Sequence, residues 1–104
     1  METIEILTLA IRQKKQIQYE YDLPGKAVGI RIGNPHAIFI SSAEKINIDI
    51  YKLDGVRSNS KSIPDWRQYT VKHIRNVVIL DSQFSTAINY NPLSKQYNRV
   101  ISKI

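Results

Sequence analysis

The chain has 104 residues, 42% of them hydrophobic, and no cysteine, which predicts one domain and excludes a disulfide scaffold, a cysteine-based zinc site and thiol catalysis. Fifteen Lys and Arg residues against nine Asp and Glu residues give a net charge of +6, which indicates either a polyanionic partner such as nucleic acid or a charged surface that favours solubility. We expect a cytoplasmic protein without a membrane segment, because the sequence has no signal peptide and no apolar run near the roughly 20 residues of a membrane span.

The first expected element is an amphipathic helix within residues 1–16. Thr3 is a residue type that caps helices, and the basic residues at the end of the segment suit the C-terminal end of a helix dipole. The apolar side chains of one helical face are Ile4, Leu7, Ala10 and Ile11. From Ile17 the apolar period changes to two, which predicts a half-buried strand over residues 17–21.

Turn signals divide the following residues into short strands. Pro24 and Gly25 occupy positions that a β-turn favours, and the run Gly33-Asn34-Pro35 is expected to end a strand. The strands that these patterns predict are residues 27–32, 36–41, 46–51, 66–71 and 77–80, with a single helical turn at residues 72–75. Many short strands at this spacing predict a small, mainly β barrel over residues 17–84.

The C-terminal residues 91–104 are expected to form a second helix. Asn91 can cap it, and Pro92 suits the first helical position. The apolar residues of its predicted stripe are Leu93, Tyr97, Val100, Ile101 and Ile104. We expect this helix to pack back on the barrel, and docking of a second subunit is the alternative.

Sequence motifs for catalysis or metal binding are absent. The two histidines, His36 and His73, have no metal-ligand spacing, and the four glycines form no phosphate-binding loop. The serines of the central loop have no nucleophile-elbow context. We therefore predict no metal, no cofactor, no catalytic residue and no enzyme activity.

Basic and aromatic residues gather between residues 51 and 69. They are Tyr51, Lys52, Arg57, Lys61, Trp66, Arg67 and Tyr69. Arg and Lys side chains hold phosphates, and Trp or Tyr can stack on a base. Strand alternation places Trp66 and Gln68 on one face, with Arg67 and Tyr69 on the other. Trp66 is either a wall of the core or a stacking platform, and we expect the core position.

The order of short motifs from Leu7 to Phe84 resembles the WYL-domain family. The matching pieces are IQYEY at 17–21, an Arg followed by PHAIF within 31–39, DIY at 49–51, the loop 55–62, PDWRxY at 64–69 and HIRNVVILDxxF at 73–84. The triplet that names the family falls at residues 46–48, where this chain has Ile-Asn-Ile and keeps only the aliphatic third position.

The resemblance implies an Sm-like or SH3-like barrel and a bacterial ligand-sensing role in transcription regulation or phage defence. Members bind nucleic acid or nucleotides through basic residues, with Arg31, Arg57 and Arg67 here as expected phosphate contacts. The full set of expected ligand-binding residues is Arg31, His36, Tyr51, Arg57, Ser58, Trp66 and Arg67. The chain is expected to be a stand-alone or excised WYL domain, and a homo-oligomer or a larger regulator is compatible with this. The alternative is a protein-interaction or oligomerisation module that binds no nucleic acid.

Overall fold

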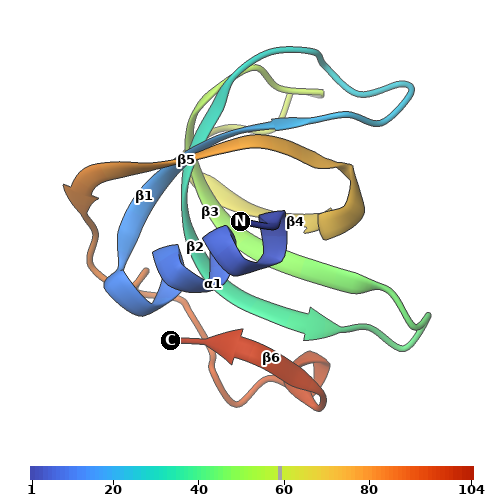
Figure 1. Cartoon of the computed structure of the whole chain (residues 1–104), viewed down its shortest axis with the longest axis vertical. Coiled ribbons are helices and arrows are strands. Elements are labelled where there is room, and N and C mark those ends of the chain that lie inside the picture. Colours follow the sequence, from blue (N-terminus) through green and yellow to red (C-terminus); the bar gives the residue numbers. More distant parts are fainter. Residues whose placement is uncertain (59) are drawn as a thin grey trace.

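The computed structural model describes residues 1–58 and 60–104 and is mainly β (Figure 1). The described residues form α1 (Thr3–Gln13), β1 (Lys15–Tyr21), β2 (Arg31–Ile40), β3 (Ile46–Gly55), β4 (Asp65–Thr70), β5 (Ile74–Gln83) and β6 (Val100–Lys103), with short 3-10 helices at Val71–His73 and Lys95–Tyr97. The mainly β class and the N-terminal helix are confirmed. The helix begins at Thr3, so the expected cap at that residue is wrong and the cap position belongs to Glu2.

All the strand pairs are antiparallel, and the order along the sheet is β4-β3-β2-β1-β5. Strand β2 is central because it pairs with β3 along one edge and with two strands along the other. Its first residues pair with β1, where Arg31 lies opposite Tyr19. Its last residues pair with β6, where Ala37 lies opposite Lys103.

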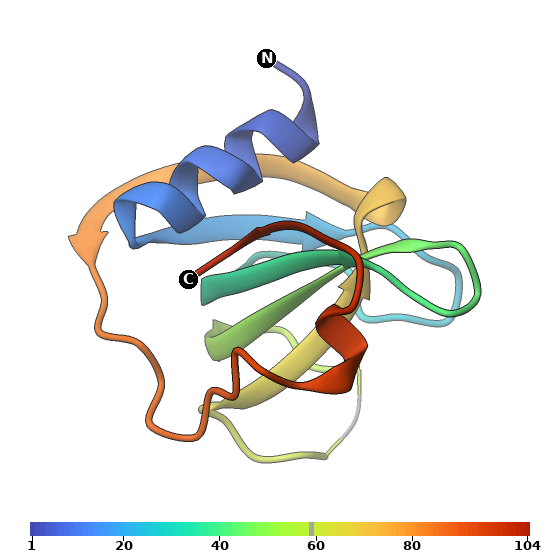
Figure 2. The same ribbon diagram turned by 90° about the horizontal axis from the view of Figure 1, so that it is seen from below.

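The sheet curls around one apolar core. Strands β1 and β4 are separated by two other strands in the sheet order, yet the hydroxyls of Tyr19 and Tyr69 are 2.9 Å apart and the rings of Tyr21 and Tyr69 are 4.8 Å apart. Side chains from α1 close this core, and Figure 2 shows the helix lying across β1 and β5. The buried core residues are Leu7, Ala10, Ile11, Ile17, Tyr19, Tyr21, Ile38, Ile48, Ile50, Tyr69, Val71 and Ile74.

The expected break at residues 33–35 is wrong, because β2 runs through it as one strand. Residues 27–30 precede the strand and belong to no strand, so the strand expected at 27–32 is also wrong. A Cβ on Gly33 would lie 2.5 Å from a side-chain methyl of Ile50, so glycine permits the close approach of β3. The register shifts at Ile32/Gly33 and at Pro35/Ala37 indicate β-bulges, which accommodate glycine and proline without ending a strand.

The expected C-terminal helix at 91–104 is also wrong. The Asn91 side chain accepts a hydrogen bond from the Leu93 N–H (3.1 Å), which closes a turn instead of starting a long helix. The chain then pairs with β2 through Arg99 O, which accepts from Ile40 N–H at 2.9 Å, and through Ile104 N–H, which donates to His36 O at 3.0 Å. This pairing satisfies backbone groups along β2, and strand geometry suits the β-branched residues of β6.

A membrane-spanning helix is not present in the described part of the chain, since α1 is too short and too polar to cross a bilayer.

Candidate functional site

A cavity of about 340 Å³ lies between the curled strands and the loop that joins β3 to β4. We call it the basic cavity. It is lined by Tyr21, Lys26, Arg31, Lys52, Ser58, Lys61, Trp66, Arg67, Gln68 and Tyr69. Five of these ten residues are lysine or arginine, so its lining is strongly cationic.

Strand alternation sends three of these cations toward the interior. On β3, Ile48, Ile50 and Lys52 share one face because side chains alternate along a strand. Arg67 on β4 lies directly opposite Ile50, so its side chain projects from the same face. Arg31 opens β2 beside β1. The position that would continue the apolar row of β3 is therefore occupied by a lysine.

Arg31 is held by a dense set of contacts. Its side chain is only 3% exposed. The guanidinium donates to Ala27 O (3.0 Å), to Ser58 Oγ (3.2 Å) and to the Tyr69 hydroxyl (3.4 Å). It also lies 5.9 Å and 5.7 Å from the ring centroids of Tyr21 and Tyr69. Its Nε is buried and has no hydrogen-bond partner among the described residues.

Lys52 is fully buried. Its Nζ donates to the carbonyl oxygen of Val56. Burial, together with the positive charges of Arg31, Arg67 and Arg57, lowers the pKa of Lys52 to about 8. The ammonium form of Lys52 still predominates below about pH 8, but its charge is less stable there than in water. An anion in the cavity would stabilise it.

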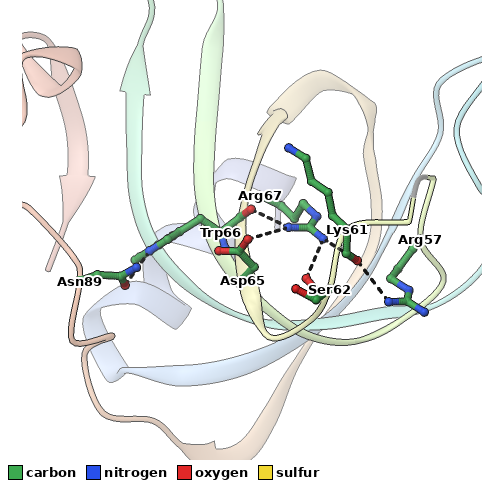
Figure 3. A network of polar contacts seen from close by, with 7 residues as sticks. All are labelled: Arg57, Lys61, Ser62, Asp65, Trp66, Arg67 and Asn89. Atoms are coloured by element: carbon green, nitrogen blue, oxygen red, sulfur yellow. Dashed lines mark hydrogen bonds and ion pairs between the residues drawn. The ribbon is translucent and has the colours of Figure 1, made fainter.

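Arg67 ties β4 to the preceding loop (Figure 3). Its guanidinium donates to three carbonyl oxygens, those of Trp66 (2.8 Å), Ser62 (3.3 Å) and Lys61 (3.5 Å). The nearest acid is Asp65, 3.9 Å away with a side chain 52% exposed. An ion pair this long and this exposed contributes little.

The basic cavity thus concentrates positive charge, and no acid is found among the described residues that line it. Neither Arg31 nor Lys52 forms an ion pair within the described chain, and Arg67 has only the distant Asp65. Unpaired buried cations are costly, so they usually have a defined partner. An anion such as a phosphate group is the partner that this arrangement can accept, through charge-assisted hydrogen bonds.

The Tyr69 hydroxyl is a further hydrogen-bond donor in the basic cavity. The Tyr69 oxygen accepts from the Tyr19 hydroxyl (2.9 Å) and from Arg31 (3.4 Å). With both acceptor positions used, its own proton is available to a bound oxygen. Burial and the neighbouring Tyr69 raise the pKa of Tyr19 far above its usual value, so Tyr19 stays a neutral donor.

A second cavity of about 340 Å³ lies on the other side of β4, beneath the C-terminal segment. We call it the polar aromatic cavity. It is lined by Asp49, Trp66, Arg67, Gln68, Asn89, Tyr90, Asn91, Ser94, Gln96 and Tyr97. Buried Asp49 accepts from Gln68 (2.9 Å), Gln96 (3.1 Å) and Tyr97 (2.5 Å). Burial and the hydrogen bond to Asp49 raise the pKa of Tyr97. The hydrogen bonds of Asp49 to Gln96 and Tyr97 hold the C-terminal segment against the sheet.

The expected site residues divide between these places. Arg31, Ser58, Trp66 and Arg67 line the basic cavity. Arg57 lies on the exposed part of the loop, where it donates to the carbonyl of Lys61 (3.2 Å).

Three of the expected residues meet on the opposite side of the sheet. Tyr51 packs against Trp66 with ring centroids 5.3 Å apart, and His36 packs against Trp66 at 4.7 Å. His36 is fully buried, its Nδ1 lies 2.8 Å from Asn34 O, and its Nε2 accepts from Ala87 N–H (3.1 Å). Burial lowers the pKa of His36, so it serves as a neutral packing residue. The structure does not bring His36 and Tyr51 together with the basic cavity.

Trp66 does not belong to the main core. It is half-buried in a separate aromatic group with His36, Tyr51 and Tyr90. Its Nε1 donates to Asn89 Oδ1 (2.8 Å). Trp66 therefore separates the two cavities and lines both.

Sequence reasoning did not place Lys52, Tyr69 or Lys26 in the site, although it noted the first two among the basic and aromatic residues. The signal for Lys52 was available, because it falls in period-two register with Ile48 and Ile50. A lysine on the apolar face of a strand is either buried or extends its ammonium group to the edge of the core. No comparable signal marked Lys26, which follows a turn.

Within the described chain, no group of three or more His, Asp or Glu residues is arranged to hold a metal ion. Comparison with protein-family models and with curated proteins finds no match to this chain. The resemblance to WYL domains therefore stays a prediction.

Proposed function

We propose that this protein is a non-enzymatic module that binds nucleic acid or nucleotides through the basic cavity. The observation that carries the proposal is the convergence of Arg31, Lys52 and Arg67 on one cavity without a buried carboxylate to balance them. Phosphate suits these residues because it accepts several charge-assisted hydrogen bonds at once. The outer cations of the cavity and the net charge of +6 would attract a polyanion toward it.

The resemblance to WYL domains supports the same ligand class. We propose that the curled sheet is an Sm-like or SH3-like barrel and that the protein acts in the bacterial cytoplasm as a ligand-sensing part of transcription regulation or phage defence. The order of strands and the short 3-10 helix before β5 agree with this proposal. The ligand-contacting residues we propose are Arg31, Lys52, Arg57, Ser58 and Arg67.

Salt dependence tests the phosphate contacts directly. A labelled single-stranded oligonucleotide of about 12 nucleotides is titrated with the protein, and binding is followed by fluorescence anisotropy at several salt concentrations. Three phosphate contacts predict a slope of about −2 in a plot of log affinity against log salt. An affinity that does not change between about 50 and 200 mM salt would contradict the proposal.

The same affinity is expected to fall as pH rises through about 8, the pKa of Lys52. A bound phosphate favours the ammonium form of Lys52 and raises its pKa, so binding takes up a proton above this pH. The charges facing Lys52 are those of Arg31, Arg67 and Arg57, with Asp54 opposing them, and arginine stays charged throughout. The measurement is anisotropy between about pH 7 and pH 9.5. The Lys52→Met variant should show no such fall.

A protein-interaction or oligomerisation module is the second candidate, favoured by apolar side chains at the surface. Val28 and Leu93 are 89% and 87% exposed, and the side chains of Val100 and Ile101 on β6 are 39% and 41% exposed. Such a surface would give a mass that rises with protein concentration and a partner affinity with little salt slope. Light scattering together with the titration above separates the two functions.

A further inference from the structure

The two cavities meet at one strand. β4 lies at the end of the sheet order and pairs only with β3 among the described strands. Trp66, Arg67 and Gln68 on β4 line both cavities. Figure 3 shows Trp66 directed to one side of β4 with Asn89, and Arg67 directed to the other side with Lys61 and Ser62.

The chemistry of the two sides differs in a consistent way. Among the described residues, the basic cavity has five cations in its lining, whereas Arg67 is the single Lys or Arg that lines the polar aromatic cavity. The buried carboxylate of Asp49 also disfavours an anion there. Its lining combines the amides of Gln68, Asn89, Asn91 and Gln96 with the rings of Trp66, Tyr90 and Tyr97. Amides hydrogen-bond to base edges and aromatic rings stack on bases.

We infer that the polar aromatic cavity is a base-binding subsite, and that a single nucleic-acid strand crosses the free edge of β4 with a phosphate in the basic cavity and a neighbouring base in the polar aromatic cavity. This inference rests on the proposed function and names its ligand as single-stranded nucleic acid. The backbone of β4 separates the cavities, so the phosphate and the base belong to a strand that passes over the edge. A duplex keeps its bases paired and stacked and could not place one there.

Asn89 is the residue best placed to contact the base. The indole of Trp66 is only a donor, so Asn89 Oδ1 must accept its hydrogen bond at 2.8 Å. This orientation leaves the Nδ2 donors of Asn89 without a partner among the described residues, at an exposed position on the cavity lining. A base that presents a carbonyl oxygen or a ring nitrogen would accept from them.

The test compares labelled oligothymidylate with an abasic oligonucleotide of the same length, and the wild type with Asn89→Leu. The wild type should bind the base-containing strand about tenfold more tightly, as expected when one base stacks. Asn89→Leu removes the amide and places an apolar side chain in the cavity lining, so it should remove most of this difference and leave abasic binding unchanged. The control Asn98→Leu makes the same exchange on the same segment, at an exposed residue outside this cavity, and should behave as wild type.

The outcomes distinguish a failure of the base subsite from a failure of the proposed function. Failure of both oligonucleotides to bind would overturn the proposed function and the inference with it. Equal binding of both strands by the wild type, with no effect of Asn89→Leu, would overturn the base subsite and leave phosphate binding in place. Thermal unfolding of each variant establishes that it is folded, and Asn89→Ala, which removes the amide without adding bulk, repeats the test if the leucine variant unfolds.

Discussion

Replacing Lys52 with methionine is expected to make the protein more stable and to weaken its binding of nucleic acid. Lys52 is fully buried beside Arg31 and Arg67 and has no ion pair among the described residues. Methionine has a similar length and no charge, so the free energy of unfolding should rise by about 1 to 2 kcal/mol at pH 7, after the loss of one hydrogen bond. Oligonucleotide affinity should fall by about tenfold, as expected for one charged contact.

The gain in stability should depend on pH in a defined direction. The pKa of Lys52 is lowered in the folded protein to about 8 from 10.5, so the unfolded chain binds more protons between these values. Wild-type stability therefore rises with pH across this interval, and the cost of the buried charge is fully present below about pH 8. The advantage of Lys52→Met should shrink as pH rises from 8 toward 10.5.

Chemical denaturation at pH 7 and at higher pH measures this effect, with Lys45→Met as the control. Lys45 is an exposed residue in the turn between β2 and β3, so its replacement removes the same charge without changing the cavity. A Lys52→Met variant that is less stable than wild type at pH 7 would show that the lysine stabilises the fold. The proposal that the basic cavity binds an anion would then lose its main support.

Charge reversal at Arg67 is expected to abolish oligonucleotide binding and to leave the domain folded. The Arg67 side chain is 14% exposed, and its hydrogen bonds go to carbonyl oxygens of Trp66, Lys61 and Ser62. Glutamate would repel a phosphate at this position, and the affinity should fall by about 100-fold or more. Arg67→Lys keeps the charge without the planar fork and should lose about tenfold.

Anisotropy titration gives the affinities, and near-ultraviolet circular dichroism together with the emission of Trp66 reports the fold. The control is Lys72→Glu, which changes the net charge by the same amount at an exposed residue of the 3-10 helix after β4. An equal loss in both variants would attribute the effect to net charge instead of to the cavity. Unfolding of both Arg67 variants would show that this residue is structural.

Arg67 and Lys52 illustrate why a binding site can weaken a fold. The apolar row of β3 ends in a lysine, and the edge strand beside it contributes an arginine opposite Ile50. Replacing such cations with apolar side chains would improve packing and remove repulsion. The presence of Lys52 and Arg67 is understandable if a bound anion balances their positive charges. Residues that serve function often reduce the stability of a fold.

The sequence by itself determined the local elements whose apolar period is regular. The face of α1 with Leu7 and Ile11 and the alternation of Ile17 and Tyr19 on β1 are both buried as expected. The Ile48 and Ile50 positions of β3 belong to the same core. The reason is that periodicity records which face of an element meets the core, and that depends only on neighbouring residues.

Two predictions from local sequence patterns were wrong, the break at residues 33–35 and the helix at 91–104, because strand pairing in the tertiary structure determines the conformation there. Glycine and proline at 33–35 suggest a break, but bulges opposite β3 keep β2 continuous. The C-terminal residues have a helical apolar spacing, but β2 offers them unpaired backbone groups, and β6 forms there. In both cases the deciding partner is another strand outside the local segment, so no local pattern contains the information.

Identifying the residues of the candidate site required both the sequence and the tertiary structure. The sequence predicted Arg67 as a phosphate contact because basic residues are interleaved with aromatic residues between positions 51 and 69, whereas Arg31 was expected from the resemblance to WYL domains. Only the curl of the sheet shows that Lys52 and Tyr69 join them, while His36 packs among aromatic rings on the other side. The physical reason is that composition gives the charge of a chain, whereas the convergence of that charge on one cavity requires strands β2, β3 and β4 to be brought together by long-range hydrogen bonds.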